Sequence, residues 1–402
     1  MLFGLRFDLR NPAFAGVSAT DRYQTALDMC EWADRRGAAF ISVSEHHGSD
    51  DGYLPSPLVM AAAIGARTSN AAIGINALVA SFHDPLRLAE DIAVVDLVCG
   101  GRFNVTIAGG YLPAEFDMFG VPLTERAARV RETVATLRAA WTGEPFEYRG
   151  RTVQVHPVPA QPGGPKIILG GTSEGAARRA ERIADGFIPS EPECWEFYRD
   201  ECVKLGKDDP GPGMTGHGDT VILAEDPEAA WSELGPHFLY ETNAYGTWQA
   251  AAGIGAATYR PMSDIDEVRA SGQYRILTPD EYRQELAAAG DLPFAMFHPD
   301  GRGHPADRRV AAPPPLRGRV PLTDQGAPAL PDGSNRRTLR HTLVSCSTPV
   351  SKSHSSDDWT NQSSAILVTV ATIAAAVMPG SSAASIQPRR CNSPSACSVS
   401  SR

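Results

Sequence analysis

The stretch AFISVSEHHGSDDGYLPSPLVMAAAIGART, residues 39–68, contains an apolar run, a polar turn and a helix-like segment. Its first part, AFISVS (39–44), has the apolar and β-branched composition that is typical of a buried strand. Ser56 followed by Pro57 is a typical start of a helix. A strand followed by a helix is half of a βα repeat, so this stretch predicts a parallel sheet covered by helices.

The same alternation continues on both sides of this stretch. Further strands are expected at 2–9, 71–80, 102–110, 166–171, 185–190, 219–226 and 291–299, helices at 19–36, 84–101, 123–142 and 279–289, and a hairpin at 146–157. About eight parallel strands with interleaved helices are typical of a TIM barrel. A doubly wound sheet is the alternative, but no GxGxxG follows the first strand. We therefore predict an α/β fold, a TIM (β/α)8 barrel, over residues 1–299.

Composition narrows the classes of partner and compartment. Residues 1–300 hold 25 Lys and Arg against 42 Asp and Glu, a net charge of −17, whereas the remainder holds 12 against 5, a net charge of +7. The acidic body argues against a nucleic acid or an anionic membrane as partner. The seven cysteines form no CxxC pair and the N-terminus has no signal-peptide pattern, so we expect reduced thiols and a cytoplasmic location. The apolar run at 365–378 is too short for a typical transmembrane helix.

Polar or glycine-rich groups follow several of the expected strands. In a barrel, the residues at the C-terminal ends of the strands line the mouth of the active site. The residues predicted to meet there are Glu45, His46, His47, Asn76, Ala77, Gly109, Gly110, Tyr111, Gly170, Gly171, Thr172, Ser173 and, at the end of the last strand, His298. Each segment alone is a weak indication of a site, whereas the convergence of several segments on one rim is a specific indication.

The pair His46-His47 after Glu45 allows several interpretations. A solvated turn, or a structural hydrogen bond to a carboxylate, is the common role of such a pair. Adjacent side chains at the end of a strand diverge, and no HExxH motif is present, so no metal is expected. A metal-dependent hydrolase that uses both histidines stays a minor alternative. We expect one histidine to face the site as a base or donor and the other to be structural.

Two glycine-containing turns are candidate ligand-binding segments. GGTSEGAARRA (170–180) starts a helix whose backbone N–H groups and dipole favour a phosphate. In AGGYLPAEF (108–116) the two glycines allow the backbone to approach a flat ligand closely. A capped strand-to-helix turn and an ordinary tight turn explain the two patterns equally well. Arg178 and Arg179 are expected on a solvated helix face.

Read in order, these residues resemble the bacterial luciferase-like flavin oxidoreductase family. The shared pattern is EHH, P-x-P-x-x-x-A-A-A, D-P-x-R-x-A-E-D, D-x-x-x-x-G-R and a glycine-rich turn, all of which lie between residues 45 and 110. The resemblance covers about residues 2–299. It implies a TIM barrel that binds FMN, or alternatively coenzyme F-420, at the C-terminal mouth.

The resemblance also implies roles for individual residues. His46 would assist catalysis near the reactive edge of the flavin, with Glu45 or His47 orienting it. The Asn76–Ala77 peptide would be a cis bulge behind the isoalloxazine. The turn of Gly109, Gly110 and Tyr111 and the turn of Gly170, Gly171, Thr172 and Ser173 would hold the ribityl-phosphate. Luciferase has an arginine in the first of these turns, where this chain has Gly109.

The expected activity is a flavin-dependent monooxygenase that oxidises a small organic substrate with reduced FMN and oxygen. F-420-dependent hydride transfer is one alternative, and a non-catalytic flavin-binding barrel or inactive paralogue is another. A small-molecule substrate, a separate flavin reductase and a second copy of the chain are the expected partners. The substrate would be selected by mouth loops at 111–122 and 240–275.

Residues 300–402 differ in composition from the rest of the chain and contain no glutamate. A linker or a disordered regulatory tail is one interpretation. The other is a frameshifted or mis-called gene end, because permitted codons for residues 300–319 read one base later encode an amphipathic helix. That helix would close the barrel, so the sequence predicts a final helix that is missing or replaced, and a poorly stable chain. Sequencing the locus tests this prediction.

Overall fold

The computed structural model describes residues 2–211, 220–254, 259–288, 294–298 and 369–370. All of them belong to one compact unit, Met1–Gly303 with Ala365–Arg402. The second unit, His304–Ser364, lies outside the described residues. The predicted tail at 300–402 and its proposed closing helix also lie outside them, apart from Thr369–Val370.

The strands form one ten-stranded sheet in the order β10-β9-β12-β11-β1-β2-β3-β4-β7-β8. Their bounds are β1 Leu2–Phe7, β2 Phe40–Val43, β3 Ala72–Val79, β4 Phe103–Ala108, β7 Ile167–Gly171, β8 Gly186–Pro189, β9 Thr220–Leu223, β10 Tyr274–Leu277, β11 Phe294–His298 and β12 Thr369–Val370. The strands from β11 through β8 pair in parallel, as do β9 and β10, whereas β12 pairs antiparallel with β11 and β9. The predicted hairpin at 146–157 is present as β5 (Phe146–Tyr148) and β6 (Arg151–Val153).

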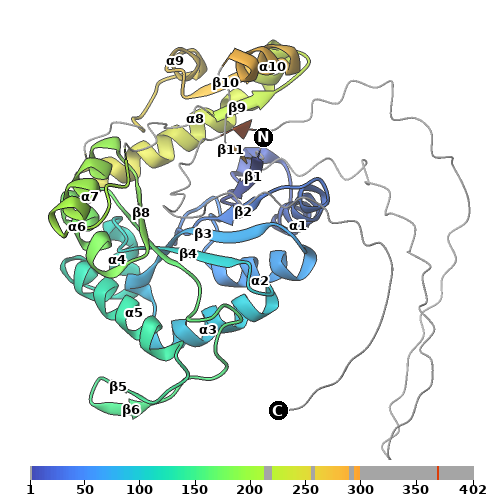
Figure 1. Cartoon of the computed structure of the whole chain (residues 1–402). Coiled ribbons are helices and arrows are strands. Elements are labelled where there is room, and N and C mark those ends of the chain that lie inside the picture. Colours follow the sequence, from blue (N-terminus) through green and yellow to red (C-terminus); the bar gives the residue numbers. More distant parts are fainter. Residues whose placement is uncertain (1, 212–219, 255–258, 289–293, 299–368, 371–402) are drawn as a thin grey trace, which may run out of the picture. The chain divides into compact units, whose positions relative to one another are not determined.

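Helices follow most of the parallel strands. Their bounds are α1 Ala19–Arg35, α2 Pro57–Arg67, α3 Pro85–Val98, α4 Pro113–Phe119, α5 Arg126–Ala140, α6 Glu174–Ile183, α7 Pro192–Lys204, α8 Pro227–Ala251, α9 Ile265–Ala270 and α10 Pro279–Ala288, with 3-10 turns at Ala13–Ala15, Ala80–Phe82 and Leu123–Glu125. Figure 1 shows α2, α3 and α5 on the outside of β2, β3 and β4. This βα order with parallel pairing confirms the predicted TIM-barrel type of α/β fold. Within the described ranges, no helix combines the length and apolarity needed to span a bilayer.

Two segments that we expected to be loops are partly helical, so those predictions are wrong in part. The segment 111–122 contains α4, which begins with Pro113 in its first turn and ends at Gly120 in the left-handed conformation. The segment 240–275 contains the second half of α8, which starts at the Asp226 cap and continues through Pro236. An internal proline normally ends or kinks a helix, but α8 continues past Pro236.

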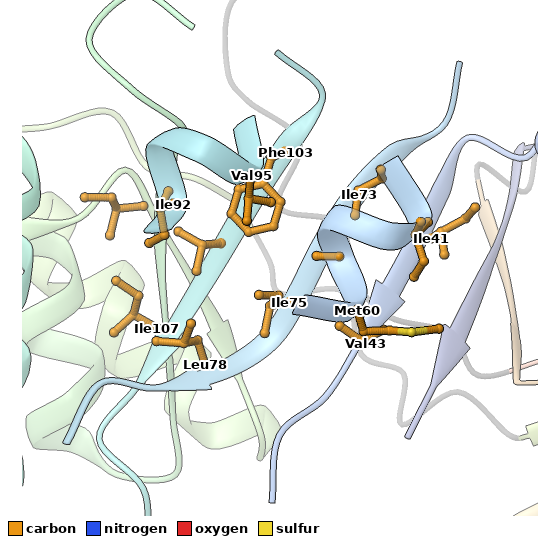
Figure 2. Packing of buried hydrophobic residues seen from close by; sticks show 14 of the residues in the cluster. Ile41, Val43, Met60, Ile73, Ile75, Leu78, Ile92, Val95, Phe103 and Ile107 are labelled. Carbon is orange, nitrogen blue, oxygen red and sulfur yellow. The ribbon is translucent and has the colours of Figure 1, made fainter. Parts of the chain in front are cut away.

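The core of the barrel lies between the central strands and their helices. Figure 2 shows Ile41 and Val43 of β2 beside Met60 of α2, while Ile92 of α3 lies near Phe103 of β4. These side chains are 0–4% exposed, and burial of each contributes about 1.5–3 kcal/mol. Packing on both faces of the strands holds the C-terminal ends of β2, β3 and β4 at one edge, where the candidate residues lie.

Candidate active site

His46 is held by a carboxylate from a distant segment. The residue directly follows the β2 region, and its Nδ1 lies 2.7 Å from Oε1 of Glu115 in α4. Both residues are buried, with 7% and 2% of their surfaces exposed. An ionised carboxylate only accepts hydrogen bonds, so Nδ1 carries the proton in this pair and Nε2 is left as the acceptor or base. Nε2 lies 3.4 Å from the hydroxyl of Tyr111.

Glu45 does not orient His46, contrary to the expectation from sequence. Its Oε1 accepts from Nε2 of His47 at 2.8 Å and lies 3.4 Å from Nε2 of His83. Its Oε2 accepts from the backbone N–H of Val79 at 2.7 Å. Burial raises the pKa of Glu45, but the bonds from His47 and His83 outweigh burial, so the pKa is lowered overall. Glu45 therefore ties the end of β2 to the end of β3.

The two histidines face different surroundings. His47 packs between the rings of Phe82 and Phe119, with centroid distances of 5.4 and 4.8 Å. His46 instead packs on Trp248, with a centroid distance of 4.5 Å. The two imidazoles therefore lie in different environments. Among the described residues, no group of His, Cys, Asp and Glu has an arrangement suited to a metal ion.

The predicted cis peptide is confirmed at Asn76–Ala77. The register between β3 and β4 shifts between Asn76 and Leu78, as a bulge requires. Oγ1 of Thr106 donates to Oδ1 of Asn76 at 2.6 Å. A Cβ added at Gly170 would lie 3.4 Å from Thr106 and 3.8 Å from the Cβ of Ala77. The bulge in β3 and the turn after β7 are therefore neighbours.

The turn after β4 requires glycine at residue 110. Gly110 has φ +80°, and a Cβ there would lie 2.8 Å from Cγ1 of Val79. At Gly109, a Cβ would lie 3.4 Å from the Cβ of Arg126, the first residue of α5. This chain has no arginine at residue 109, but the aliphatic part of the Arg126 side chain lies directly beside that position.

The turn after β7 leads tightly into α6. A Cβ at Gly171 would lie 2.4 Å from the Cβ of Ala176, so the turn needs glycine. Oγ of Ser173 accepts from the backbone N–H of Ala176 at 3.3 Å and caps the helix, while Thr172 and Ser173 are exposed. The structure thus shows a capped turn, and the hydroxyl hydrogen of Ser173 is not used in this cap.

The two arginines of α6 differ, contrary to the expected shared solvated face. Arg178 pairs with Glu174 at 2.7 Å and Glu201 at 2.9 Å. Arg179 is half-buried, and burial together with the charges of Arg131 and Arg126 lowers its pKa. In the part of the chain that the structure describes, none of Arg126, Arg131 and Arg179 has a carboxylate partner within ion-pair distance. Neighbouring cations without counter-charges are suited to an anion such as a phosphate.

Aromatic rings from three separate segments surround His46. The centroid distances from His46 are 4.9 Å to Tyr53, 5.6 Å to Tyr111, 6.2 Å to Tyr245 and 4.5 Å to Trp248. Burial raises the pKa of Tyr53 and of Tyr111, so both hydroxyls stay protonated at neutral pH. Sequence reasoning missed Tyr245 and Trp248 because their segment was expected to be a loop. Their i, i+3 spacing on one helix face is the signal that would have shown them.

The sequence and the fold of this chain are similar to those of known proteins. A family model described as luciferase-like monooxygenase matches residues 1–293. The oxygenase component of the flavin-dependent trigonelline monooxygenase of Acinetobacter baylyi is 28% identical over 130 residues, which are 32% of this chain and 36% of that protein. The F420-dependent glucose-6-phosphate dehydrogenase of Nocardia farcinica is 31% identical over 193 residues, which are 44% of this chain and 56% of that protein.

A solved structure also matches at the level of the fold. The monooxygenase RslO1 from Streptomyces bottropensis has a TM-score of 0.51 and 25% identity, over 69% of this chain and 92% of that one. The matches to the curated relatives are shorter, and this chain covers less than two thirds of the length of each of the two relatives above. Because the family model spans most of the chain, the protein belongs to the luciferase-like monooxygenase family.

Proposed function

We propose that this chain is a flavin-dependent monooxygenase that uses reduced FMN and oxygen to oxidise a small organic substrate. The observation that carries the proposal is the buried pair of His46 and Glu115 beside Tyr111, which leaves Nε2 of His46 as a base or acceptor. The trigonelline monooxygenase component, a relative that is flavin-dependent by name, supports this assignment. His46 would move a proton at Nε2, with Glu115 as its positioning residue.

The residues present fit a flavin that carries a phosphate. Arg126, Arg131 and Arg179 offer cationic charge beside the turn after β4 and along α6. Ser173 at the start of α6 offers a hydroxyl and backbone N–H groups. When bound, the flavin would supply the electrons and, with oxygen, the oxidising chemistry. The Asn76–Ala77 bulge and the glycine turns would support its ring and its chain.

The rings around His46 would keep water away from the reacting atoms. Tyr53 and Tyr245 are buried, and their hydroxyls lie 3.0 Å apart. Tyr111 and Trp248 are half-buried and form the side of the site nearer to solvent. A water-poor site strengthens the hydrogen bonds and charge interactions made inside it.

F-420-dependent hydride transfer is the second candidate, and the F420-dependent relative from Nocardia farcinica favours it. A reduced flavin must come from elsewhere in the FMN case, so we propose a separate flavin reductase as a partner. The trigonelline monooxygenase relative is named as an oxygenase component, which supports that partner. A homodimer and a cytoplasmic location remain part of the proposal.

Flavin binding by matched arginine variants tests the proposal. We expect FMN to bind more tightly than riboflavin, which lacks the phosphate. Arg179→Gln should weaken the binding of FMN and leave the binding of riboflavin unchanged. Loss of one charge-assisted bond of about 1.5–3 kcal/mol corresponds to roughly 10- to 100-fold in Kd. Arg178→Gln is the matched control, because Arg178 is paired with Glu174 and Glu201 and its loss should leave both affinities unchanged.

Absorbance titrations with FMN, riboflavin and F-420 give the readout and select the cofactor. Binding of F-420 without FMN would replace the first candidate by the second. Binding of neither FMN nor F-420 would refute both candidates. Equal affinities for FMN and riboflavin, unaffected by Arg179→Gln, would refute the arginine site alone.

A further inference from the structure

Arg10 is a buried cation that lies within ion-pair distance of Asp8 and Asp51 but forms no side-chain hydrogen bond among the described residues. It follows β1, and only 5% of its surface is exposed. Its guanidinium carbon lies 4.8 Å from the ring centroid of Tyr53, 4.4 Å from that of Tyr245 and 4.8 Å from that of Trp248. Nε, Nη1 and Nη2 are all buried, and none donates a hydrogen bond to another described residue. Buried polar groups are normally hydrogen-bonded, so these donors point to a ligand.

The same three rings that contact Arg10 also contact His46. Tyr53, Tyr245 and Trp248 lie 4.9, 6.2 and 4.5 Å from the His46 ring, measured between centroids. Arg10, His46 and these rings therefore form one aromatic compartment. Arg10 and His46 both contact these rings, and Arg6 donates to the hydroxyl of Tyr245 at 3.3 Å.

The charges around Arg10 define which ligand suits it. Nε lies 3.4 Å from Oδ2 of Asp8, and Nη1 lies 3.7 Å from Oδ2 of Asp51. Glu241 also acts on Arg10 electrostatically, whereas Arg6 adds a second cation next to Asp8. Three carboxylates thus oppose two guanidinium groups. A further anion would be repelled, whereas a neutral oxygen acceptor adds no charge.

Arg10 keeps its charge in this setting. Burial alone would lower its pKa, but Tyr245 and Asp8 outweigh burial and raise it. A charged guanidinium donates and cannot accept, and its planar fork suits an sp² oxygen with two lone pairs. The aromatic walls suit an unsaturated or ring-containing body.

We propose that Arg10 binds the carbonyl oxygen of a small, neutral, ring-containing substrate whose body packs against Tyr53, Tyr245 and Trp248. This names the substrate class of the site and rests on the function proposed for that site. The half-buried Trp248 lies on the solvent side of the compartment, while Arg10 lies in its buried part. The carbonyl would therefore enter first and the ring would be covered last.

Binding of three matched probes to the full chain without added flavin tests the proposal by isothermal titration calorimetry. Acetophenone carries a carbonyl, ethylbenzene has the same size without an acceptor, and benzoate carries an anion. We expect acetophenone to bind at least about 10-fold more tightly than either of the others, the value of one hydrogen bond to a charged group. Arg10→Met should reduce acetophenone to the affinity of ethylbenzene. Arg36→Met, which removes an exposed arginine 4.2 Å from the Trp32 ring, is the control and should change nothing.

Asp51→Asn provides a second, independent arm. It removes one negative charge near Arg10, so benzoate affinity should rise while ethylbenzene affinity stays the same. The affinities of Asp51→Asn for benzoate and ethylbenzene test the proposal even if circular dichroism shows that Arg10→Met fails to fold. Tightest binding of benzoate, equal binding of acetophenone and ethylbenzene, or binding of no probe at millimolar concentration would overturn the proposal. Because no flavin is present, failure of flavin binding would refute the proposed function without affecting these results.

Discussion

Replacement of Glu115 tests directly how the site is held together. Its Oε1 accepts from Nδ1 of His46 at 2.7 Å and from the backbone N–H of His47 at 2.8 Å. Glu115→Ala leaves both buried donors unpaired at about 1–3 kcal/mol each, so we expect a loss of roughly 2–6 kcal/mol in the free energy of unfolding. Glu115→Gln keeps the oxygen but removes the charge that makes such bonds about twice as strong, so roughly 1–3 kcal/mol is expected.

Urea unfolding measures these losses, and ¹⁵N NMR of the histidine rings reports which nitrogen of His46 carries the proton. The wild-type chain should show the Nδ1–H tautomer, and Glu115→Ala should lose it. Glu125, which is exposed and pairs with Arg129 at 3.0 Å, is the matched control; Glu125→Ala should cost less than about 1 kcal/mol. If Glu115→Ala costs no more than this control, or keeps the Nδ1–H tautomer, the carboxylate does not hold His46 and the reasoning fails.

Three further changes test other parts of the fold. The pKa of Glu45 is lowered from 4.5, so its stabilisation is fully present above that pH and declines as the pH falls through the lower pKa of the folded state. Glu45→Gln should therefore cost about 1–3 kcal/mol in urea unfolding at pH 7, and this cost should shrink steadily as the pH is lowered from 4.5. Equal costs would contradict this. Gly110→Ala should lower the melting temperature more than Gly120→Ala, because both glycines have positive φ but a Cβ at Gly120 meets nothing within 4 Å. Arg102→Met should cost about 3 kcal/mol in urea unfolding, because Arg102 donates to three backbone carbonyls; a loss below about 1 kcal/mol would assign it a merely solvated role.

The fold was predictable where the local pattern and the packing agree. The expected strand at 39–44 is observed as Phe40–Val43, and the expected helix at 84–101 as Pro85–Val98. Both have clear apolar periods and well-defined ends, such as the Asp84 cap. The helix α8 was missed because Gly235 and Pro236 interrupt its pattern. A Cβ added at Gly235 would lie 2.6 Å from Cγ2 of Ile265, so α8 packs closely against the start of α9 at this point.

The candidate site was predictable only in part. His46 and the Asn76–Ala77 cis peptide follow from the positions of strand ends and from the family resemblance. Glu115 was missed because it lies 69 residues from His46 in the sequence, and no local pattern links the two. Arg10 was missed for the same reason, since its rings come from the loop between β2 and α2 and from α8, far along the chain. Such pairings depend on how parallel strands meet at one edge and cannot be inferred from spacing.

The hydrogen bonds from the His46 ring and the His47 backbone to Glu115 have a consequence for exchanging segments between relatives. The stretch after β4 is the kind of surface segment that tolerates insertion and replacement elsewhere in a barrel. Here it supplies the group that sets the proton position on a histidine of another repeat. A chimera that imports a foreign segment at 109–122 must therefore bring a carboxylate at the position of Glu115, or redesign the turn after β2 along with it. The two turns therefore have to be exchanged as one unit.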